Sequence, residues 1–76
     1  MDIGRAIREI ATSKGMKQAD LCALTGVSDG YMSLLWNSRI EDPKASSIVK
    51  TTKALGVSYD ALFELADKYE FPKKDK

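Results

Sequence analysis

The sequence predicts an all-α fold of five short helices, and three kinds of observation lead to this prediction. Apolar residues recur three and four positions apart in successive segments, which is the spacing of one helix face. Gly15, Gly26 and Gly56 each follow such a segment, and glycine readily takes the left-handed conformation that ends a helix. Ser28 and Ser58 stand where the next helix would begin, because a serine hydroxyl can accept from a free backbone N–H group there.

The first helix is expected to run from Asp2, as its cap, to about Ser13. Ile3, Ile7 and Ile10 lie four and three positions apart and form one apolar stripe. The two alanines of this segment border the stripe, whereas its arginines fall on or beside the polar face. This helix is therefore predicted to be amphipathic, with its isoleucines in the core.

Residues 18–37 organise the rest of the chain, since they indicate a short helix, a sharp turn and a second short helix. Leu21 and Leu24 lie three positions apart on one side of the first of these helices. The second, from about Ser28 to Asn37, has an apolar stripe made of Met32, Leu35 and Trp36. This arrangement is helix-turn-helix geometry, in which the second helix can enter a DNA major groove.

Burying that stripe turns the opposite side of the second helix outward, since successive residues are about 100° apart. The outward face and its flanks carry small polar groups, an amide, a phenol and one leucine, a mixture that suits base edges. The predicted base contacts are Asp29, Gly30, Tyr31, Ser33, Leu34 and Asn37. The alternative is a short core helix whose exposed side happens to carry little charge, and the pattern alone favours neither.

Two further helices are predicted in the second half of the chain. The fourth spans about 45–55, and its apolar face is expected to consist of Ala45, Ile48, Val49, Thr52 and Leu55. The fifth follows Ser58 and carries apolar residues as far as Tyr69, spread over more than one stripe. Part of this surface is expected to stay exposed and to bind a partner, most simply a second copy in a twofold homodimer. The predicted dimer interface consists of Phe63, Leu65, Tyr69 and Phe71.

The 76 residues suffice for one small domain, predicted to span 1–69, followed by a flexible tail over 70–76. The formal net charge of +1 does not indicate strong non-specific electrostatic binding to DNA. The single cysteine, Cys22, cannot form an internal disulfide and is expected to be a small buried hydrophobe, with a regulatory thiol as the alternative. No apolar run approaches the ~20 residues that span a bilayer, so we expect a cytoplasmic protein without membrane attachment.

Enzymatic chemistry finds little support in the sequence. The chain contains no histidine and only one cysteine, and its carboxylates do not cluster on one helix face. A catalytic or metal site would need residues that are missing or scattered. The sequence therefore predicts a protein that is not an enzyme, with no metal, no cofactor and no small-molecule substrate.

The order Gln18-x-x-Leu21-Cys22-x-x-x-Gly26-Val27-Ser28-x-x-x-Met32-Ser33 resembles the signature of the XRE family, the Cro and cI type of helix-turn-helix. The similarity extends from about Ile3 to Leu65, and Ala54-Leu55-Gly56-Val57-Ser58 resembles the turn between the family's last two helices. The resemblance implies a compact five-helix Cro/cI-repressor-like domain that binds double-stranded DNA. It also strengthens the expectation that Gln18, at a helix start, contacts a phosphate.

The chain departs from the family pattern in two respects. Relatives often carry an arginine at the position of Ala11 and a glutamate at that of Trp36, and here an apolar pair replaces this ion pair. A packed apolar pair can do so with little loss of stability. In addition, no lysine or arginine lies between Asp20 and Asn37. Cations for DNA must therefore come from the flanking segments, and the predicted phosphate contacts are Lys17, Gln18, Ser28, Ser38, Arg39 and Lys44.

Two classes of function follow from the resemblance. The first is a sequence-specific transcriptional regulator, most simply a repressor, that binds a palindromic operator as a homodimer. It would resemble a phage repressor or a restriction-modification controller, although the spacing of Tyr31-Met32-Ser33 and Asn37-Ser38-Arg39 does not match the controllers cleanly. The second is an antitoxin or protein-interaction module that uses the last helix, with DNA binding secondary. Asp29 and the near-neutral charge favour the second class.

Overall fold

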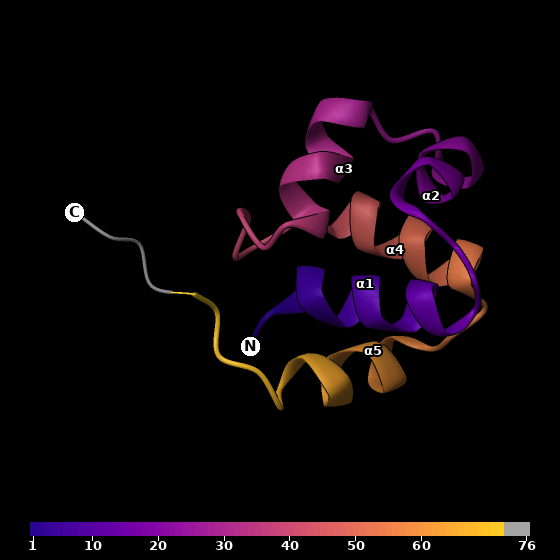
Figure 1. Ribbon diagram of the computed structural model, residues 1–76. Coiled ribbons are helices and arrows are strands. Elements are labelled where there is room, and N and C mark those ends of the chain that lie inside the picture. Colours follow the sequence, from indigo (N-terminus) through magenta and orange to yellow (C-terminus); the bar gives the residue numbers. More distant parts are fainter. Residues whose placement is uncertain (73–76) are drawn as a thin grey trace.

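A computed structural model describes residues 1–72 of the chain, and within that range all regular structure is α-helical. The helices are α1 (Ile3–Ser13), α2 (Gln18–Thr25), α3 (Asp29–Trp36), α4 (Ala45–Leu55) and α5 (Tyr59–Ala66) (Figure 1). The prediction of an all-α domain with five helices is confirmed.

The helix ends lie where local sequence chemistry predicts them. Asp2, Ser28 and Ser58 each accept a hydrogen bond from the backbone N–H group three residues later, at 3.0, 3.3 and 3.1 Å. Each bond satisfies one of the free N–H groups at a helix start. Gly26 and Gly56 end α2 and α4 with φ angles of 72° and 70°, the left-handed conformation that a side chain would disfavour.

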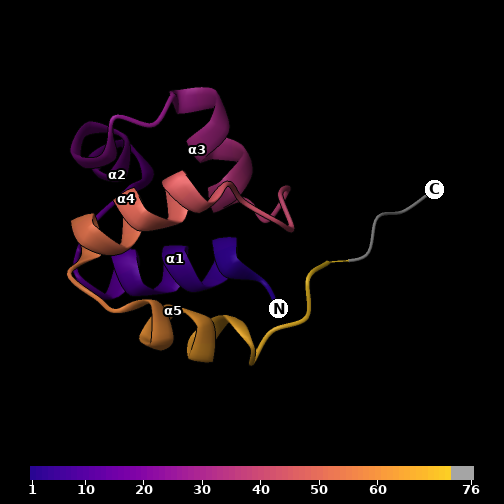
Figure 2. The same cartoon turned by 180° about the vertical axis from the view of Figure 1, so that it is seen from behind.

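The helices are arranged around α1. This helix packs against α5 on one side and against α3 and α4 on the other, while α2 packs against α3 and α4. Two opposite views show α5 at one edge of the domain and α3 at the other, with α1 and α4 between them (Figures 1 and 2). The helix expected to read DNA and the helix expected to mediate dimerisation are therefore on opposite sides.

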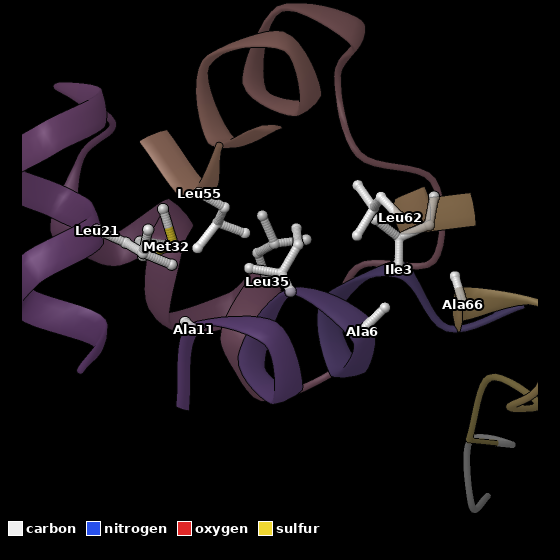
Figure 3. Packing of buried hydrophobic residues seen from close by; sticks show 10 residues of the cluster. Ile3, Ala6, Ala11, Leu21, Met32, Leu35, Leu55, Leu62 and Ala66 are labelled. Carbon is white, nitrogen blue, oxygen red and sulfur yellow. The ribbon is translucent and has the colours of Figure 1, made fainter. Parts of the chain in front are cut away.

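One core joins all five helices, and α2 and α4 contribute one buried apolar residue each. Its buried members are Ile3, Ala6, Ile7, Ala11, Leu21, Met32, Leu35, Leu55, Leu62 and Ala66. Leu35 lies near the middle of this cluster, between Met32 and Leu21 on one side and Ile3 and Leu62 on the other (Figure 3). Because Leu35 belongs to α3, the orientation of α3 is fixed by the centre of the core.

The buried face of α4 differs from the predicted one. Ala45 is exposed, whereas Ser47 and Thr51 are buried beside Leu55. The Thr51 hydroxyl donates to the Ser47 carbonyl oxygen at 2.7 Å, so its burial leaves no unsatisfied polar group. Periodicity of apolar residues missed this face because two hydroxyl side chains occupy it.

Two other expectations are corrected. Leu24 does not share the core with Leu21, since 60% of its surface is exposed and Thr25 takes the buried position one turn after Leu21. The Thr25 hydroxyl donates to the Leu21 carbonyl oxygen at 2.6 Å, which satisfies it within the helix. The helix expected to reach Tyr69 ends at Ala66. The N–H groups of Lys68 and Tyr69 donate to carbonyl oxygens three residues earlier, not four, and so form a tight turn.

The predicted tail over 70–76 falls partly outside the described residues, since 73–76 are not among them, and 70–72 contain no helix. None of the helices in the described range is long and apolar enough to cross a lipid bilayer.

Candidate nucleic-acid interface

The orientation of α3 decides which of its side chains are available to DNA. Met32 and Leu35 are fully buried, and α1 approaches α3 so closely that a Cβ atom at Gly4 would lie 1.9 Å from the Leu35 carbonyl oxygen. Trp36 packs against the core but is only half-buried, not fully buried as expected. It is the last residue of α3 and lies at the edge of the buried stripe, so the core covers one side of the indole.

The opposite side of α3 faces outward. Asp29, Gly30, Leu34 and Asn37 are exposed, and 49% of the Leu34 surface is accessible. Nothing lies within 4 Å of the position that a Cβ atom at Gly30 would take. Ser33, also predicted to contact bases, is half-buried. The predicted outward rotation of Gly30, Leu34 and Asn37 is confirmed.

Two of the predicted base contacts are engaged within the domain. The Tyr31 phenol oxygen accepts a hydrogen bond from the Lys44 backbone N–H group at 3.0 Å, which ties α3 to the start of α4. The Lys44 ammonium nitrogen lies 5.6 Å from the centre of the Tyr31 ring, within cation–π range. Asn37 donates from Nδ2 to the Ser33 carbonyl oxygen at 2.8 Å, which leaves its Oδ1 and one N–H free.

Asp29 is next to Cys22 of α2, a neighbour that sequence reasoning did not identify. Burial, and then a side-chain hydrogen bond to Asp29 and the charge of its carboxylate, raise the pKa of the Cys22 thiol above 9.0. The thiol is therefore protonated at neutral pH and can donate to the carboxylate. Cys22 is half-buried, which corrects the expectation of full burial.

The start of α2 carries two predicted phosphate contacts and one acidic group. Lys17 is exposed and Gln18, the first residue of α2, is half-buried. Asp20 accepts from the Lys17 backbone N–H group at 2.8 Å, so a carboxylate already occupies part of this helix start. Ser28, at the start of α3, is exposed, and its hydroxyl keeps a hydrogen to donate while it accepts from the backbone.

The loop after α3 carries the remaining predicted phosphate contacts. Arg39 and Lys44 are exposed, as such contacts require. Ser38 is half-buried instead, and its hydroxyl lies 3.0 and 2.9 Å from the two carboxylate oxygens of Asp2. The Ser38 side chain therefore points into the domain, and its role is to hold the loop in place. Sequence reasoning had assigned Asp2 only the capping of α1.

The apolar side chains expected on an exposed α5 surface are largely covered. Phe63, Leu65, Tyr69 and Phe71 are all half-buried. The Tyr69 hydroxyl donates to the Glu9 carboxylate at 2.5 Å, and the Arg5 guanidinium lies 3.9 Å from the centre of its ring. The hydrogen bond to Glu9, followed by burial, raises the pKa of Tyr69 above 10.0.

In the part of the chain that the structure describes, the exposed large apolar side chains are Met1, Leu24, Leu34 and Tyr59. Of the four predicted interface residues, Tyr69 already contacts Glu9 and Arg5 of α1.

No group of three or more His, Cys, Asp or Glu side chains within 1–72 is arranged to hold a metal ion.

A helix-turn-helix whose second helix is anchored by its core face and free on the other defines a DNA-binding domain. The family model of the Cro/C1-type HTH DNA-binding domain matches residues 6–68, and the chain belongs to this family. Neither the search of curated proteins nor the search of solved structures returned a match.

Proposed function

We propose that this chain is a transcriptional repressor that binds a palindromic operator as a homodimer, with α3 in the major groove. The observation that carries the proposal is the division of α3 into two sides. Met32 and Leu35 anchor it in the core, whereas Gly30 and Leu34 lie on the exposed side. Nothing lies within 4 Å of the position that a Cβ atom at Gly30 would take. Glycine within a helix is less favourable than alanine, and close approach of α3 to DNA is a reason for a glycine at this position.

The residues predicted to contact bases are proposed to have different roles. Leu34 supplies an apolar contact for a thymine methyl group, and Gly30 allows close approach of the helix to the bases. Asp29, Ser33 and Asn37 contribute polar atoms at the same surface. Tyr31 is proposed to make at most one hydrogen bond to DNA, as a donor, because its phenol oxygen already accepts from the Lys44 backbone N–H group.

The proposed phosphate contacts come from the segments that flank α3 in the sequence. Lys17, Gln18 and Ser28 lie on the α2 side, and Arg39 and Lys44 lie on the α4 side. These cations are needed because α3 itself has none. We assign no direct phosphate contact to Ser38, whose hydroxyl is directed at Asp2.

The proposed dimer uses α5 and the segment after it. Phe63, Leu65 and Phe71 are partly exposed there, and Tyr59, exposed at the start of α5, extends the same helix. Tyr69 contributes indirectly, by holding the segment against α1. A twofold pair would present two α3 helices to grooves about 34 Å apart.

The test is selection of a random duplex library by the purified protein, with its mass in solution measured alongside. We expect a dimer, a palindromic consensus and affinity that falls steeply with salt. Arg39→Ala should weaken binding to all sequences alike and reduce the salt slope by about 1 per subunit, whereas Ser33→Ala or Leu34→Ala should change the preferred sequence. Lys53→Ala, which removes the same charge from an exposed residue in the last turn of α4, outside both proposed surfaces, is the matched control. Absence of binding to every duplex would refute the proposal.

An antitoxin or protein-interaction module remains the second candidate, and Asp29 is the observation that favours it. A carboxylate on a surface that faces phosphates lowers affinity for every sequence alike, unless it pairs with a base. Phe63 and Leu65 are half-buried, however, so the exposed apolar surface of α5 that a partner protein would bind is smaller than expected.

A further inference from the structure

Asp29 is the only charged residue of α3, and it is negative. Its neighbours on the exposed side carry no charge, and the polar atoms there belong to Ser33 and Asn37. Gly30 and Leu34 have no polar side-chain atoms, and an Nδ2 hydrogen of Asn37 is bound to the Ser33 carbonyl oxygen. The strongest hydrogen-bonding group on this surface is therefore a carboxylate, which can only accept.

The place of Asp29 on α3 is also well defined. Asp29 is the first residue of α3, directly after the Ser28 cap, so its backbone is fixed by the helix start. The Cys22 thiol on α2 is near enough that the Asp29 carboxylate helps to raise the pKa of this thiol. An ionised carboxylate has about four acceptor sites, so a contact with one thiol leaves most of them free.

The major groove offers hydrogen-bond donors on only two bases, the N4 amino group of cytosine and the N6 amino group of adenine. Adenine places its N7 acceptor beside N6, and that lone pair repels the second oxygen of a carboxylate. Cytosine has no acceptor of its own beside N4 on this edge. A carboxylate that faces the groove therefore favours cytosine over adenine, and it rejects the acceptor edges of guanine and thymine.

We propose that Asp29 is a specificity-determining residue that selects cytosine at one position of each operator half-site, by accepting from the N4 amino group. This inference rests on the proposed function, since it requires α3 to lie in the major groove. It also accounts for the acidic residue in an interface that must approach phosphates. The repulsion applies to every sequence, whereas the compensating hydrogen bond forms only where cytosine is present.

The experiment compares the wild-type protein with Asp29→Asn and Asp20→Asn in selection from a random duplex library. Asp20→Asn is the matched control, because it removes the same charge from the start of α2 and can still accept from the Lys17 N–H group. Circular dichroism and thermal melting establish that all three proteins are folded.

We expect the wild type and Asp20→Asn to select the same cytosine, with Asp20→Asn binding all sequences somewhat more tightly. Asp29→Asn should lose that preference or replace it with adenine, since an amide pairs with adenine N6 and N7. Changing the cytosine in the selected site should weaken the wild type by roughly 5- to 100-fold and Asp29→Asn by much less.

Two results would overturn the inference, and they are distinguishable. If the wild type selects a clear sequence and Asp29→Asn selects the same one, Asp29 does not read a base, and the proposed function stands. If the wild type binds no duplex in preference to others, the proposed function and this inference both fail.

Discussion

The Ser38 hydroxyl donates to the carboxylate of Asp2, a residue that lies 36 positions earlier and is only 2% exposed. The same carboxylate accepts from the Arg5 backbone N–H group, and the Asp2 N–H group donates to the Ala66 carbonyl oxygen at 3.1 Å. One residue thereby joins the start of α1, the loop after α3 and the end of α5. Because Arg39 follows Ser38 directly, this contact positions a proposed phosphate-binding side chain.

Ser38→Ala is expected to lower the free energy of unfolding by about 1–3 kcal/mol, because it removes a donor from a buried carboxylate. Urea denaturation measures the loss, with Ser46→Ala, exposed on α4, as the control that should change stability by less than about 0.5 kcal/mol. An equal, small effect of both substitutions would show that the Asp2 carboxylate does not depend on Ser38.

Gly4→Ala and Gly30→Ala should have opposite effects on stability. A Cβ atom at Gly4 would collide with the Leu35 carbonyl oxygen, so we expect a loss of about 1–3 kcal/mol or more as α1 and α3 separate. Gly30 is open to solvent within α3, and alanine there should stabilise the helix by roughly 0.5–1 kcal/mol.

The same pair separates folding from DNA binding. Gly30→Ala places a methyl group on the proposed base-reading surface and should weaken binding of the selected operator although the domain is more stable. Thermal melting and a fluorescence binding titration measure the two effects. Undiminished operator binding by Gly30→Ala would contradict close approach of α3 to the bases at this residue.

Tyr31→Phe tests the link between α3 and α4. It removes the acceptor of the Lys44 N–H group while keeping the ring, and the expected loss is about 1 kcal/mol in urea denaturation. Tyr59→Phe is the control, because Tyr59 is exposed on α5 and should tolerate the change. If the two variants are equally stable, water replaces the phenol at the start of α4 without cost.

The reactivity of Cys22 should depend on pH in a way that reports on Asp29. Alkylation requires the thiolate, so the rate should rise with a midpoint above 9.0 in the folded protein. Asp29→Asn removes the carboxylate's contribution and leaves that of burial, so the midpoint should move down towards 9.0. Rates of iodoacetamide labelling between pH 7 and 11 provide the measurement, and coincident profiles for both proteins would exclude the contact.

The sign of the accompanying stability effect follows from the raised pKa. Burial, followed by the hydrogen bond to Asp29 and its charge, raises the pKa of the Cys22 thiol, so the associated stability is present below pH 9.0 and is lost as pH rises through the folded pKa. Asp29→Asn should therefore reduce the decline of stability between neutral and strongly alkaline pH.

The sequence by itself determined the helices, most of their ends and the rotation of α3. These features depend on residues three and four positions apart, as in the caps at Asp2, Ser28 and Ser58 and the burial of Met32 and Leu35. The family resemblance rests on the same local spacing, and the match over residues 6–68 confirms it.

Only the tertiary structure decided how the exposed polar side chains are used. Ser38 turns inward to Asp2, Tyr31 binds the Lys44 N–H group 13 residues later, and Tyr69 binds Glu9 across 60 residues. Local periodicity carries no information about partners so distant in the chain, because those contacts form only when the shared core brings the helices together. The pattern also predicted that Trp36 would be fully buried, whereas it is half-buried because it is the last residue of an eight-residue helix.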